Sequence, residues 1–303
     1  MPPSGDWRAV LDEAADARVT VVVGASDAGK TTLVATLAGE LASRGASVAV
    51  VDADVGQSEI GPPTTVGLGS VAGRLDRLSD AALIALQFVG VSSPVRDIRG
   101  VVDATRRMAD RARADGFDRV LVDTSGLVAG WPGRLLKERK IAALDPDLVL
   151  LLQRGDECEA LVARYASSSR PRVVRIAAAG RPRSRSQAVR RAHRMAAFDR
   201  YLHRAAVVPI ALSGVAVRTP ADVPLDACAD ALCGLDDARG DTLALGVVAS
   251  VTSETLRVLT PLPRRTGVAG VRVGLERRDG TLVVPAPARS GSTRADDGRD
   301  RGR

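Results

Sequence analysis

The residues from Gly24 to Thr31 constrain this chain more than any other segment, because they read Gly-Ala-Ser-Asp-Ala-Gly-Lys-Thr. This is a complete match to the pattern G-x-x-x-x-G-K-[ST], in which backbone N–H groups wrap around phosphate oxygens. The match follows an apolar β-branched run, Val19–Val23, and opens a helical stretch. A strand, a glycine-rich turn and a helix N-terminus are the context that this motif requires, so we expect a phosphate-binding P-loop.

Short apolar segments alternate with helical segments as far as about residue 204. We expect strands at Val19–Val23, Val48–Val51, Leu86–Val89, Arg119–Asp123, Leu148–Leu152 and Arg172–Ile176, and helices at Thr31–Arg44, Asp97–Ala114, Arg134–Leu144, Asp156–Ser168 and Ser186–Arg204. This alternation is typical of an α/β domain with a doubly wound parallel sheet. We therefore predict a P-loop domain of that class over residues 1–204.

The character of the sequence changes at about Ala205. Short apolar runs separated by Gly, Pro and Asp follow, at Leu243–Val251, Thr255–Leu259, Val271–Leu275 and Thr281–Val284. Runs of this kind predict a small β-rich C-terminal domain over residues 205–287. Residues 288–303 consist mostly of Arg, Asp, Gly and Ser, so we expect a disordered tail there.

Positive charge is concentrated in one part of the chain. The 43 basic residues include only three lysines, Lys30, Lys137 and Lys140, and the others are arginines. Eleven arginines and a single acid, Asp199, lie in the segment Arg170–Arg204, a net charge of +10 in a chain whose total is +7. A genome rich in arginine codons would raise the number of arginines, but it would not concentrate them. The segment, with an arginine-rich helix within residues 180–204, favours a polyanionic partner.

Two arginines of this helix, Arg190 and Arg194, are four residues apart and share one helix face with Phe198 and Tyr201. An arginine placed over a phosphoryl group neutralises the charge that develops during transfer. The alternative is an amphipathic helix that packs through its apolar residues and exposes a solvated basic face. Because acids are almost absent and a phosphate site is expected elsewhere on the chain, we favour a lid helix.

Acidic residues lie at the ends of two expected strands. Asp52 and Asp54 follow the second strand, and Asp123 closes the strand that precedes Thr124–Gly126. Because the carboxyl ends of parallel strands line the ligand crevice of a doubly wound sheet, these carboxylates should face the γ-phosphate region. A carboxylate there can hold Mg²⁺ or accept a proton from an attacking hydroxyl, and Asp123 matches the position beside the Mg²⁺-binding Thr31. The alternatives are a strand cap at Asp52 and a plain turn at Asp123.

Composition disfavours several other classes of protein. No apolar run approaches the ~18 residues that span a membrane, and Met1–Trp7 lacks the charged-then-apolar pattern of a signal peptide. We therefore expect a cytoplasmic protein without a membrane partner. The three cysteines have no Cys-x-x-Cys spacing, so we expect reduced thiols and no zinc site.

Four segments of the chain together resemble the polynucleotide 5′-hydroxyl kinases. The segments are Gly24–Leu33, Val51–Pro63, Phe88–Pro94 and Val122–Gly130. That family of P-loop kinases includes the kinase of the eukaryotic mRNA 3′-end cleavage machinery and the kinase of pre-rRNA processing, and this chain is more similar to the shorter archaeal and bacterial members. The block from Asp52 to Gln57 is the most specific part, since many ATPases share the P-loop and few share both. The resemblance runs from about Trp7 to Tyr201, and a weaker similarity extends into the C-terminal domain.

The resemblance implies ATP-dependent phosphorylation of the 5′-hydroxyl ends of RNA or DNA, with ATP and Mg²⁺ as cofactors. It implies that Lys30 holds phosphate, that Asp54 takes the proton of the 5′-hydroxyl, and that Arg190 and Arg194 close over the γ-phosphate. The residues expected to contact ATP are Gly24, Ala25, Ser26, Asp27, Ala28, Gly29, Lys30, Thr31, Thr32, Thr124 and Gly126. The expected metal ligands are Thr31, Asp52 and Asp123. The residues expected to contact the substrate are Gln57, Gly130 and Trp131. Eukaryotic members often have tryptophan directly after the glycine that corresponds to Gly126, whereas this chain has Leu127 there.

Two other functions are compatible with parts of the sequence. A regulatory ATPase or GTPase that switches a protein partner would also use the Asp123–Gly126 segment. Against it, the chain has no Asn-Lys-x-Asp guanine-reading motif and no early lysine of the partition-type ATPases in its P-loop. A kinase of a small metabolite is the third hypothesis, which the basic segment disfavours. The choice between RNA and DNA and the oligomeric state are left open by the sequence.

Overall fold

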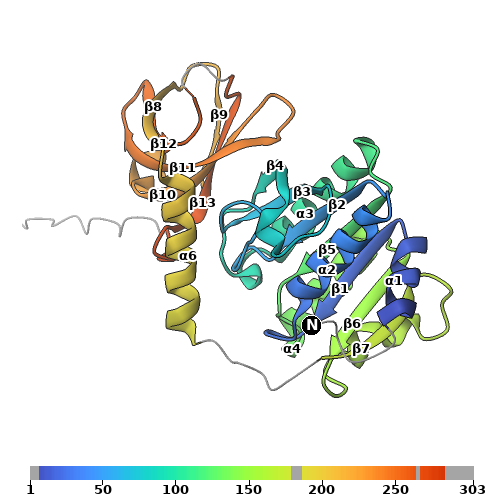
Figure 1. Ribbon diagram of the computed structural model, residues 1–303. Helices are drawn as coiled ribbons and strands as arrows, with labels where there is room; N and C mark the ends of the chain where they lie inside the picture. Colours follow the sequence, from blue (N-terminus) through green and yellow to red (C-terminus); the bar gives the residue numbers. More distant parts are fainter. Residues whose placement is uncertain (1–6, 179–185, 264–266, 284–303) are drawn as a thin grey trace, which may run out of the picture.

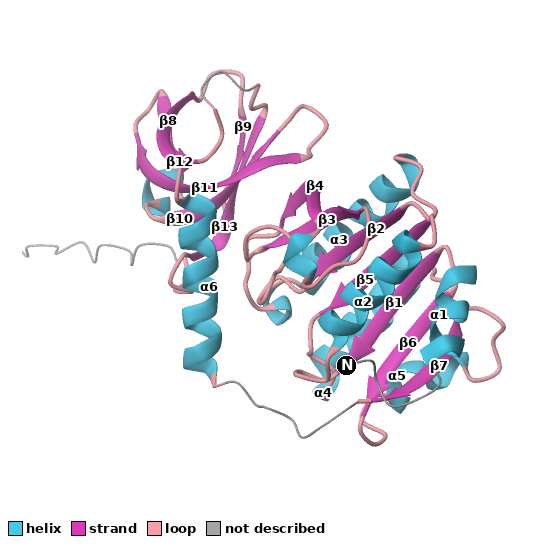
Figure 2. Cartoon of the chain, viewed as in Figure 1, coloured by secondary structure: helices cyan, strands magenta, loops and turns pink. Residues whose placement is uncertain are grey.

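The computed structural model describes residues 7–178, 186–263 and 267–283. Within them an α/β unit and a β-rich C-terminal unit lie next to each other, and helix α6 (Gln187–Leu202) runs from the second unit down beside the first (Figures 1 and 2). The expected tail at 288–303 and the start of the expected lid segment, 180–185, lie outside the described residues. The division at residues 204 and 205 remains a prediction.

The α/β unit is built on a sheet whose centre is parallel. The central strands are β1 (Val19–Gly24), β2 (Val48–Ala53), β5 (Arg119–Thr124), β6 (Leu148–Gln153) and β7 (Arg172–Ala177), in the order β7-β6-β1-β5-β2. All their pairings are parallel. Every residue of β1, β2 and β6 is buried, as expected of parallel strands that are covered on both faces. The strands expected from these apolar runs are confirmed.

Helices cover both faces of the sheet (Figure 1). They are α1 (Trp7–Asp16), α2 (Lys30–Ser43), α3 (Ile98–Ala114), α4 (Gly130–Leu144) and the short α5 (Glu159–Val162). One core cluster joins Leu11 of α1 and the residues of α2 to Val22 of β1. The other joins Met108 of α3 and Leu136 of α4 to Val21 of β1. Neighbouring residues of one strand therefore point into different cores, which confirms the predicted doubly wound fold.

Two strands extend this sheet in the antiparallel direction, so the sheet is not parallel throughout. β3 (Thr65–Val71) pairs antiparallel with β2, and β4 (Ala82–Phe88) pairs antiparallel with β3. The sequence pattern does not predict β3, because Gly67 and Gly69 interrupt it. A Cβ atom at Gly67 would lie 2.0 Å from the carbonyl oxygen of Ile60, so this strand requires glycine for packing and loses its sequence signal as a result.

The helix expected at Asp156–Ser168 is much shorter in the structure. Only α5 and a 3₁₀ turn at Ala163–Tyr165 are helical there. Leu161 and Val162 are the buried residues of α5, and a run of three serines, 167–169, follows the turn. Too few apolar side chains are present to hold a longer helix against the sheet.

The C-terminal unit is β-rich, as predicted. Its strands are β8 (Ala206–Ala211), β9 (Ala216–Arg218), β10 (Ala231–Asp236), β11 (Thr242–Val251), β12 (Thr255–Thr260) and β13 (Gly270–Arg277). β11 pairs with β10, β12 and, through Thr242 and Leu86, with β4 of the first unit. Of the strand expected at Thr281–Val284, the structure describes residues 281–283, which form only an isolated bridge between Glu276 and Leu282.

Helix α6 is anchored on the C-terminal unit by its second half. Phe198 and Leu202 are buried against Leu232 and Leu245. The hydroxyl of Tyr201 accepts a hydrogen bond from the backbone N–H of Leu245 at 3.0 Å. The first half of α6, which carries Arg190, Arg191 and Arg194, is thereby held beside the α/β unit (Figure 1).

Candidate active site

The loop between β1 and α2 has the backbone of a phosphate-binding loop. Gly29 has a φ of +97°, a left-handed conformation that glycine adopts without strain. Lys30 is the first residue of α2, and its Nζ donates a 2.9 Å hydrogen bond across the loop to the carbonyl of Ala25. Burial lowers the pKa of Lys30, and the carboxylates of Asp123 and Asp54 oppose this shift. The ammonium group therefore lies over the loop, where a bound phosphate would meet it.

A second loop, Thr124–Gly126, lies directly against the P-loop. A Cβ atom at Gly126 would lie 2.4 Å from Oγ and 2.5 Å from Cα of Ser26, so only glycine fits there. Oγ1 of Thr124 donates to the carbonyl of Val22 in β1 at 2.8 Å. The two loops consequently interlock at the carboxyl ends of neighbouring strands.

Thr31 and Asp123 form a pair that suits a divalent cation. Oγ1 of Thr31 donates to Oδ2 of Asp123 at 2.6 Å. Oδ1 of Asp123 is buried and has no hydrogen-bond partner among the described residues. A buried carboxylate oxygen without a partner is costly, and a threonine hydroxyl beside a carboxylate is the set of groups with which P-loop proteins bind Mg²⁺. Burial raises the pKa of Asp123 to about 6, although the Thr31 bond opposes this.

These two residues fit Mg²⁺ only together with other ligands. Among residues 7–178, 186–263 and 267–283, no group of three or more His, Cys, Asp or Glu side chains is arranged to hold a metal ion. An ion at Thr31 and Asp123 would therefore need phosphate oxygens and water to complete its coordination, as Mg²⁺ commonly does at nucleotide sites.

Asp52 holds the loop that follows β2. Its Oδ1 accepts from the N–H of Asp54 at 3.1 Å, and its Oδ2 accepts from the N–H groups of Glu59 and Ile60 and from the hydroxyl of Ser58. Burial and the adjacent Asp123 carboxylate raise the pKa of Asp52 to about 7. Both oxygens are engaged by the loop, so the structure gives Asp52 a loop-holding role, and its expected metal contact remains a prediction.

Asp54 and Gln57 lie on the loop that Asp52 holds. Oδ1 of Asp54 accepts from the N–H groups of Gly56 and Gln57, each at 3.1 Å. The side-chain amide of Gln57 donates to the carbonyl of Arg190 in α6 at 3.4 Å. Gln57 thus links the loop that carries Asp54 to helix α6.

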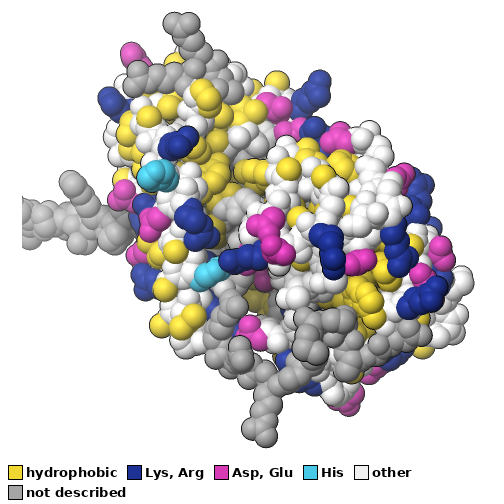
Figure 3. Space-filling view, viewed as in Figure 1, with side chains coloured by type: hydrophobic (Ala, Val, Ile, Leu, Met, Phe, Trp, Pro, Cys, Tyr) yellow, Lys and Arg dark blue, Asp and Glu magenta, His cyan; other side chains and the backbone are white. Residues whose placement is uncertain are grey.

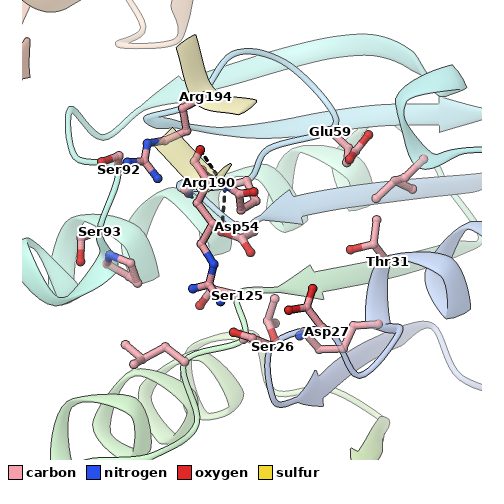
Figure 4. A pocket seen from close by; sticks show the side chains of 18 of the residues that line it. Ser26, Asp27, Thr31, Asp54, Glu59, Ser92, Ser93, Ser125, Arg190 and Arg194 are labelled. Carbon is pink, nitrogen blue, oxygen red and sulfur yellow. Dashed lines mark hydrogen bonds between the residues drawn. The ribbon is translucent and has the colours of Figure 1, made fainter. Parts of the chain in front are cut away.

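These elements enclose one cleft with a volume of about 760 Å³. Most of the expected site residues line it: Ser26, Asp27, Gly29, Lys30, Thr31, Thr32, Asp54, Gln57, Thr124, Gly126, Arg190 and Arg194. In Figure 4, Arg190 extends from α6 across the cleft toward Ser125 and Ser26, and Arg194 lies beside Ser92. On the face shown in Figure 3, basic and acidic side chains lie side by side where α6 approaches the α/β unit.

Arg190 and Arg194 of α6 have no acidic partner in the part of the chain that the structure describes. Neither Arg190 nor Arg194 forms an ion pair with another described residue, whereas Arg191 between them pairs with Asp279 at 3.7 Å. The pKa of Arg194 is lowered by burial, and the nearby cations Arg191, Arg190 and Arg96 contribute, while Glu276 opposes the shift. Two guanidinium groups that line the same cleft and have no ion-pair partner among the described residues favour an anion there.

Seven expected residues do not line the cleft. Gly24, Ala25 and Ala28 belong to the P-loop backbone, Asp52 and Asp123 lie behind the cleft wall, and Gly130 and Trp131 begin α4. The side chain of Trp131 is 72% exposed. Leu127, which directly follows the glycine of the interlocked loop, does line the cleft.

Sequence reasoning misses one wall of the cleft. Ser92 and Arg96 lie there, on the loop after β4. Glu276 of β13 is 1% exposed; it accepts from the N–H of Ser92 at 3.0 Å and pairs with the guanidinium of Arg96. A contact across 184 residues has no local sequence signal.

Sequence reasoning also misses two buried lysines. Lys137 and Lys140 of α4 are 0% and 1% exposed, directly behind the cleft. Burial lowers the pKa of Lys137 well below its ordinary value and that of Lys140 to about 8. The available signal is composition, since the other basic residues of the chain outside the P-loop are arginines.

A P-loop and a Thr–Asp pair at the carboxyl ends of a doubly wound sheet define a P-loop nucleotide-binding protein. The chain belongs to the family described as "mRNA cleavage and polyadenylation factor CLP1 P-loop", whose sequence profile matches residues 24–204. The resemblance expected from the sequence is thereby confirmed.

Several curated relatives are named polyribonucleotide 5′-hydroxyl-kinase. The relative from Pyrococcus furiosus is 35% identical over 197 residues, which is 65% of this chain and 54% of the relative. The relative from Methanocaldococcus jannaschii is 34% identical over 150 residues, 50% of this chain and 41% of the relative. The chain thus spans about half the length of the relatives it matches.

Solved structures show the same fold. Wild-type Clp1p, determined in complex with a segment of Pcf11p, superposes with a TM-score of 0.70 and covers 91% of this chain and 80% of its own, at 14% sequence identity. A second Clp1p structure gives a TM-score of 0.66 at 15% identity. None of the helices in the described ranges is long and apolar enough to cross a membrane.

Proposed function

We propose that this chain transfers the γ-phosphate of ATP to the 5′-hydroxyl end of a polynucleotide, with RNA as the preferred acceptor. The observation that carries the proposal is the cleft in which Lys30, Asp54 and the two unpaired lid arginines meet. The names of the relatives from Pyrococcus furiosus and Methanocaldococcus jannaschii support a polyribonucleotide acceptor. The cytoplasmic location expected from the sequence is part of this proposal.

Positive groups would hold the transferred phosphoryl group from two sides. Lys30 would exchange its bond to Ala25 for bonds to the β- and γ-phosphate oxygens. Arg190 and Arg194 would neutralise the γ-phosphoryl oxygens from the lid. Mg²⁺, held by Thr31 and Asp123, would neutralise phosphate charge when bound. Gly24–Thr32 and the Thr124–Gly126 loop would supply further contacts to the phosphates.

Asp54 would act as the general base. The bond from the 5′-oxygen to the γ-phosphorus forms as the bond from that phosphorus to the β–γ bridging oxygen breaks, and ADP leaves. The proton of the 5′-hydroxyl passes to the carboxylate of Asp54, which the N–H groups of Gly56 and Gln57 hold in place. The hydrogen bonds from this loop to Asp52 would set the position of the base.

Three residues would contact the acceptor strand. Gln57 lies between Asp54 and the lid helix, next to the expected position of the 5′-hydroxyl. Gly130 and Trp131 begin α4 after the interlocked loop, and the exposed indole of Trp131 is free to stack on a nucleobase.

The test is end-labelling of matched oligonucleotides with [γ-³²P]ATP. A 5′-hydroxyl RNA should be labelled, the same RNA with a 5′-phosphate should not, and a DNA of the same sequence shows the preference. Asp54→Asn should abolish labelling, whereas Asp76→Asn, which removes a carboxylate from the same cleft, should leave it. Absence of labelling with wild-type protein that still binds ATP would refute the proposal.

Two alternatives are outcomes of the same experiment. ATP or GTP hydrolysis without label transfer would indicate the regulatory NTPase that switches a protein partner. Label transfer to small hydroxylated metabolites in competition with oligonucleotides would indicate a metabolite kinase. The two unpaired lid arginines support the polyanionic acceptor over both.

A further inference from the structure

All three lysines of this chain lie at the candidate active site. Lys30 lines the cleft, and Lys137 and Lys140 are buried behind it. The chain has 43 lysines and arginines, and all of them except these three lysines are arginines. Lysine and arginine are not interchangeable, because an ammonium group is compact whereas a guanidinium is a planar fork with five donors. The two buried positions therefore indicate sites that admit a compact donor and not the larger group.

Lys137 holds the loop that lies against the P-loop. Its Nζ donates to Oγ1 of Thr124 at 3.0 Å and to the carbonyl of Ser125. The next residue is Gly126, which is in contact with Ser26 of the P-loop. A third, longer hydrogen bond runs to Oγ of Ser125 at 3.5 Å, so Lys137 sets how far this loop closes on the phosphate-binding backbone.

Lys140 holds the strand end that carries the proposed base. Its Nζ donates to the carbonyl of Ala53 at 3.0 Å, and Asp54 is the next residue. Ala53 and Thr124 are register partners on the adjacent parallel strands β2 and β5. Two lysines one turn apart on α4 thus bind neighbouring strand ends, one on the nucleotide side and one on the base side.

Helix α4 is suited to act as the support for both loops. Leu136, Ile141 and Leu144 are each 0% or 1% exposed in the core beneath the sheet. A helix packed in this way has little freedom to shift. The Nζ groups of Lys137 and Lys140 therefore hold the backbone groups that they bind in fixed positions.

We propose that Lys137 and Lys140 are positioning residues that separately set the nucleotide-binding loop and the base-carrying strand end. The Lys140 half rests on the proposed kinase function, whereas the Lys137 half requires only that the site binds ATP. Loss of Lys137 loosens the Thr124–Gly126 loop and weakens ATP binding. Loss of Lys140 displaces Asp54 and slows transfer without weakening ATP binding.

The experiment compares methionine and glutamine variants of the two lysines in the full chain. Methionine keeps most of the side-chain volume and removes the donor, and glutamine keeps an N–H donor. Arg113→Met is the matched control, because Nη2 of Arg113 donates to the carbonyl of Leu144 at the opposite end of α4, at 2.8 Å. The readouts are the Kd for ATP, kcat and KM for 5′-hydroxyl RNA, and hydrogen exchange of individual backbone amides.

Lys137→Met should raise the Kd for ATP about tenfold, the loss expected when a buried hydrogen-bonded group is removed. Lys140→Met should lower kcat about 100-fold at unchanged Kd for ATP, since a misplacement of about 1 Å costs that much. Exchange should accelerate at residues 124–128 in the first variant, at 54–60 in the second, and at neither in Arg113→Met. The glutamine variants should recover part of each loss, and they carry the test if a methionine variant does not fold.

Two results would overturn the proposal. One is that both lysine variants change Kd and kcat together and in the same way as Arg113→Met, which would show a general effect on stability. The other is that neither segment exchanges faster. If wild-type protein binds ATP but labels no oligonucleotide, only the proposed kinase function is refuted. The hydrogen-exchange and Kd measurements then still test the role of the lysines.

Discussion

Thr31 donates a 2.6 Å hydrogen bond to Asp123, a residue 92 positions later in the chain. The bond joins the first turn of α2 to the end of β5, so it brings together two of the three expected metal ligands. The second oxygen of Asp123 is buried without a hydrogen-bond partner in the part of the chain that the structure describes. Metal binding at this pair would therefore depend on the negative charge of Asp123 more than on the shape of its side chain.

Asp123→Asn should therefore raise the Mg²⁺ requirement without disrupting the fold. The asparagine side chain keeps an oxygen that can accept from Thr31 but has no negative charge, and we expect the Mg²⁺ concentration for half-maximal end-labelling to rise about tenfold or more. Magnesium titration of wild type and variant measures this. Asp76→Asn, on the same cleft, should leave the requirement unchanged, and an unaltered titration of Asp123→Asn would remove Asp123 from the metal site.

Gly126→Ala should weaken nucleotide binding by separating the two interlocked loops. The added methyl group would lie 2.4 Å from Oγ and 2.6 Å from the backbone nitrogen of Ser26, so one loop must move. We expect the Kd for ATP to rise about tenfold or more, from the displaced phosphate contacts. Gly73→Ala is the control, because no atom lies within 4 Å of its added Cβ. Equal ATP affinity in both variants would contradict the interlocking.

Arg190→Ala and Arg194→Ala should each lower kcat far more than Arg191→Ala. An arginine that neutralises a transferring phosphoryl group contributes about 10²–10³-fold or more, whereas Arg191 is exposed and paired with Asp279. Single-turnover transfer from labelled ATP measures the chemical step apart from product release. Equal effects of all three substitutions would indicate a basic face that only attracts nucleic acid, and stronger salt dependence would accompany it.

Lys140 predicts a specific dependence of stability on pH. Burial lowers its pKa to about 8 from 10.5, against the opposing effect of Asp54, Asp52 and Asp123. Between these values the unfolded chain binds a proton that the folded chain does not, so the free energy of unfolding rises with pH. Relative to Lys140→Met, wild type should gain up to about 3 kcal/mol between pH 8 and pH 10.5.

Urea unfolding at pH 7, 8, 9 and 10 measures this difference. Arg113→Met is the control, because its guanidinium stays charged over the whole range and its difference from wild type should not change. A difference between wild type and Lys140→Met that is constant with pH would show that Lys140 is not buried as the structure has it.

Local patterns predict the parts of this fold that local interactions determine. The β-branched run Val19–Val23 and the glycine-rich loop after it identify strand, turn and helix N-terminus within a few residues. Asp54 and Arg190 are predicted as site residues because their positions at a strand end and on a helix face follow from periodicity. The structure places both on one cleft.

Long-range packing determines the rest. Strand β3 requires glycine at position 67 because the backbone of Ile60 lies against that position. Glycine weakens the alternation of apolar side chains by which a strand is recognised in a sequence. In the sequence, Lys137 and Lys140 resemble exposed residues of a helix. Only the packing of α4 against the sheet shows that both are buried. Asp52 is expected at the metal because of its strand end, whereas its two oxygens are engaged by a loop that folds back onto it.

The contact of Glu276 with Ser92 and Arg96 has a consequence for how this protein can change over time. Ser92 and Arg96 of the α/β unit line one wall of the cleft, and Glu276 of the C-terminal unit binds both of them, so this wall depends on both units. A fragment that ends before β13 would keep every motif by which the chain is recognised and would lose the side chain that holds this wall. Any function of this cleft therefore depends on both units being inherited together.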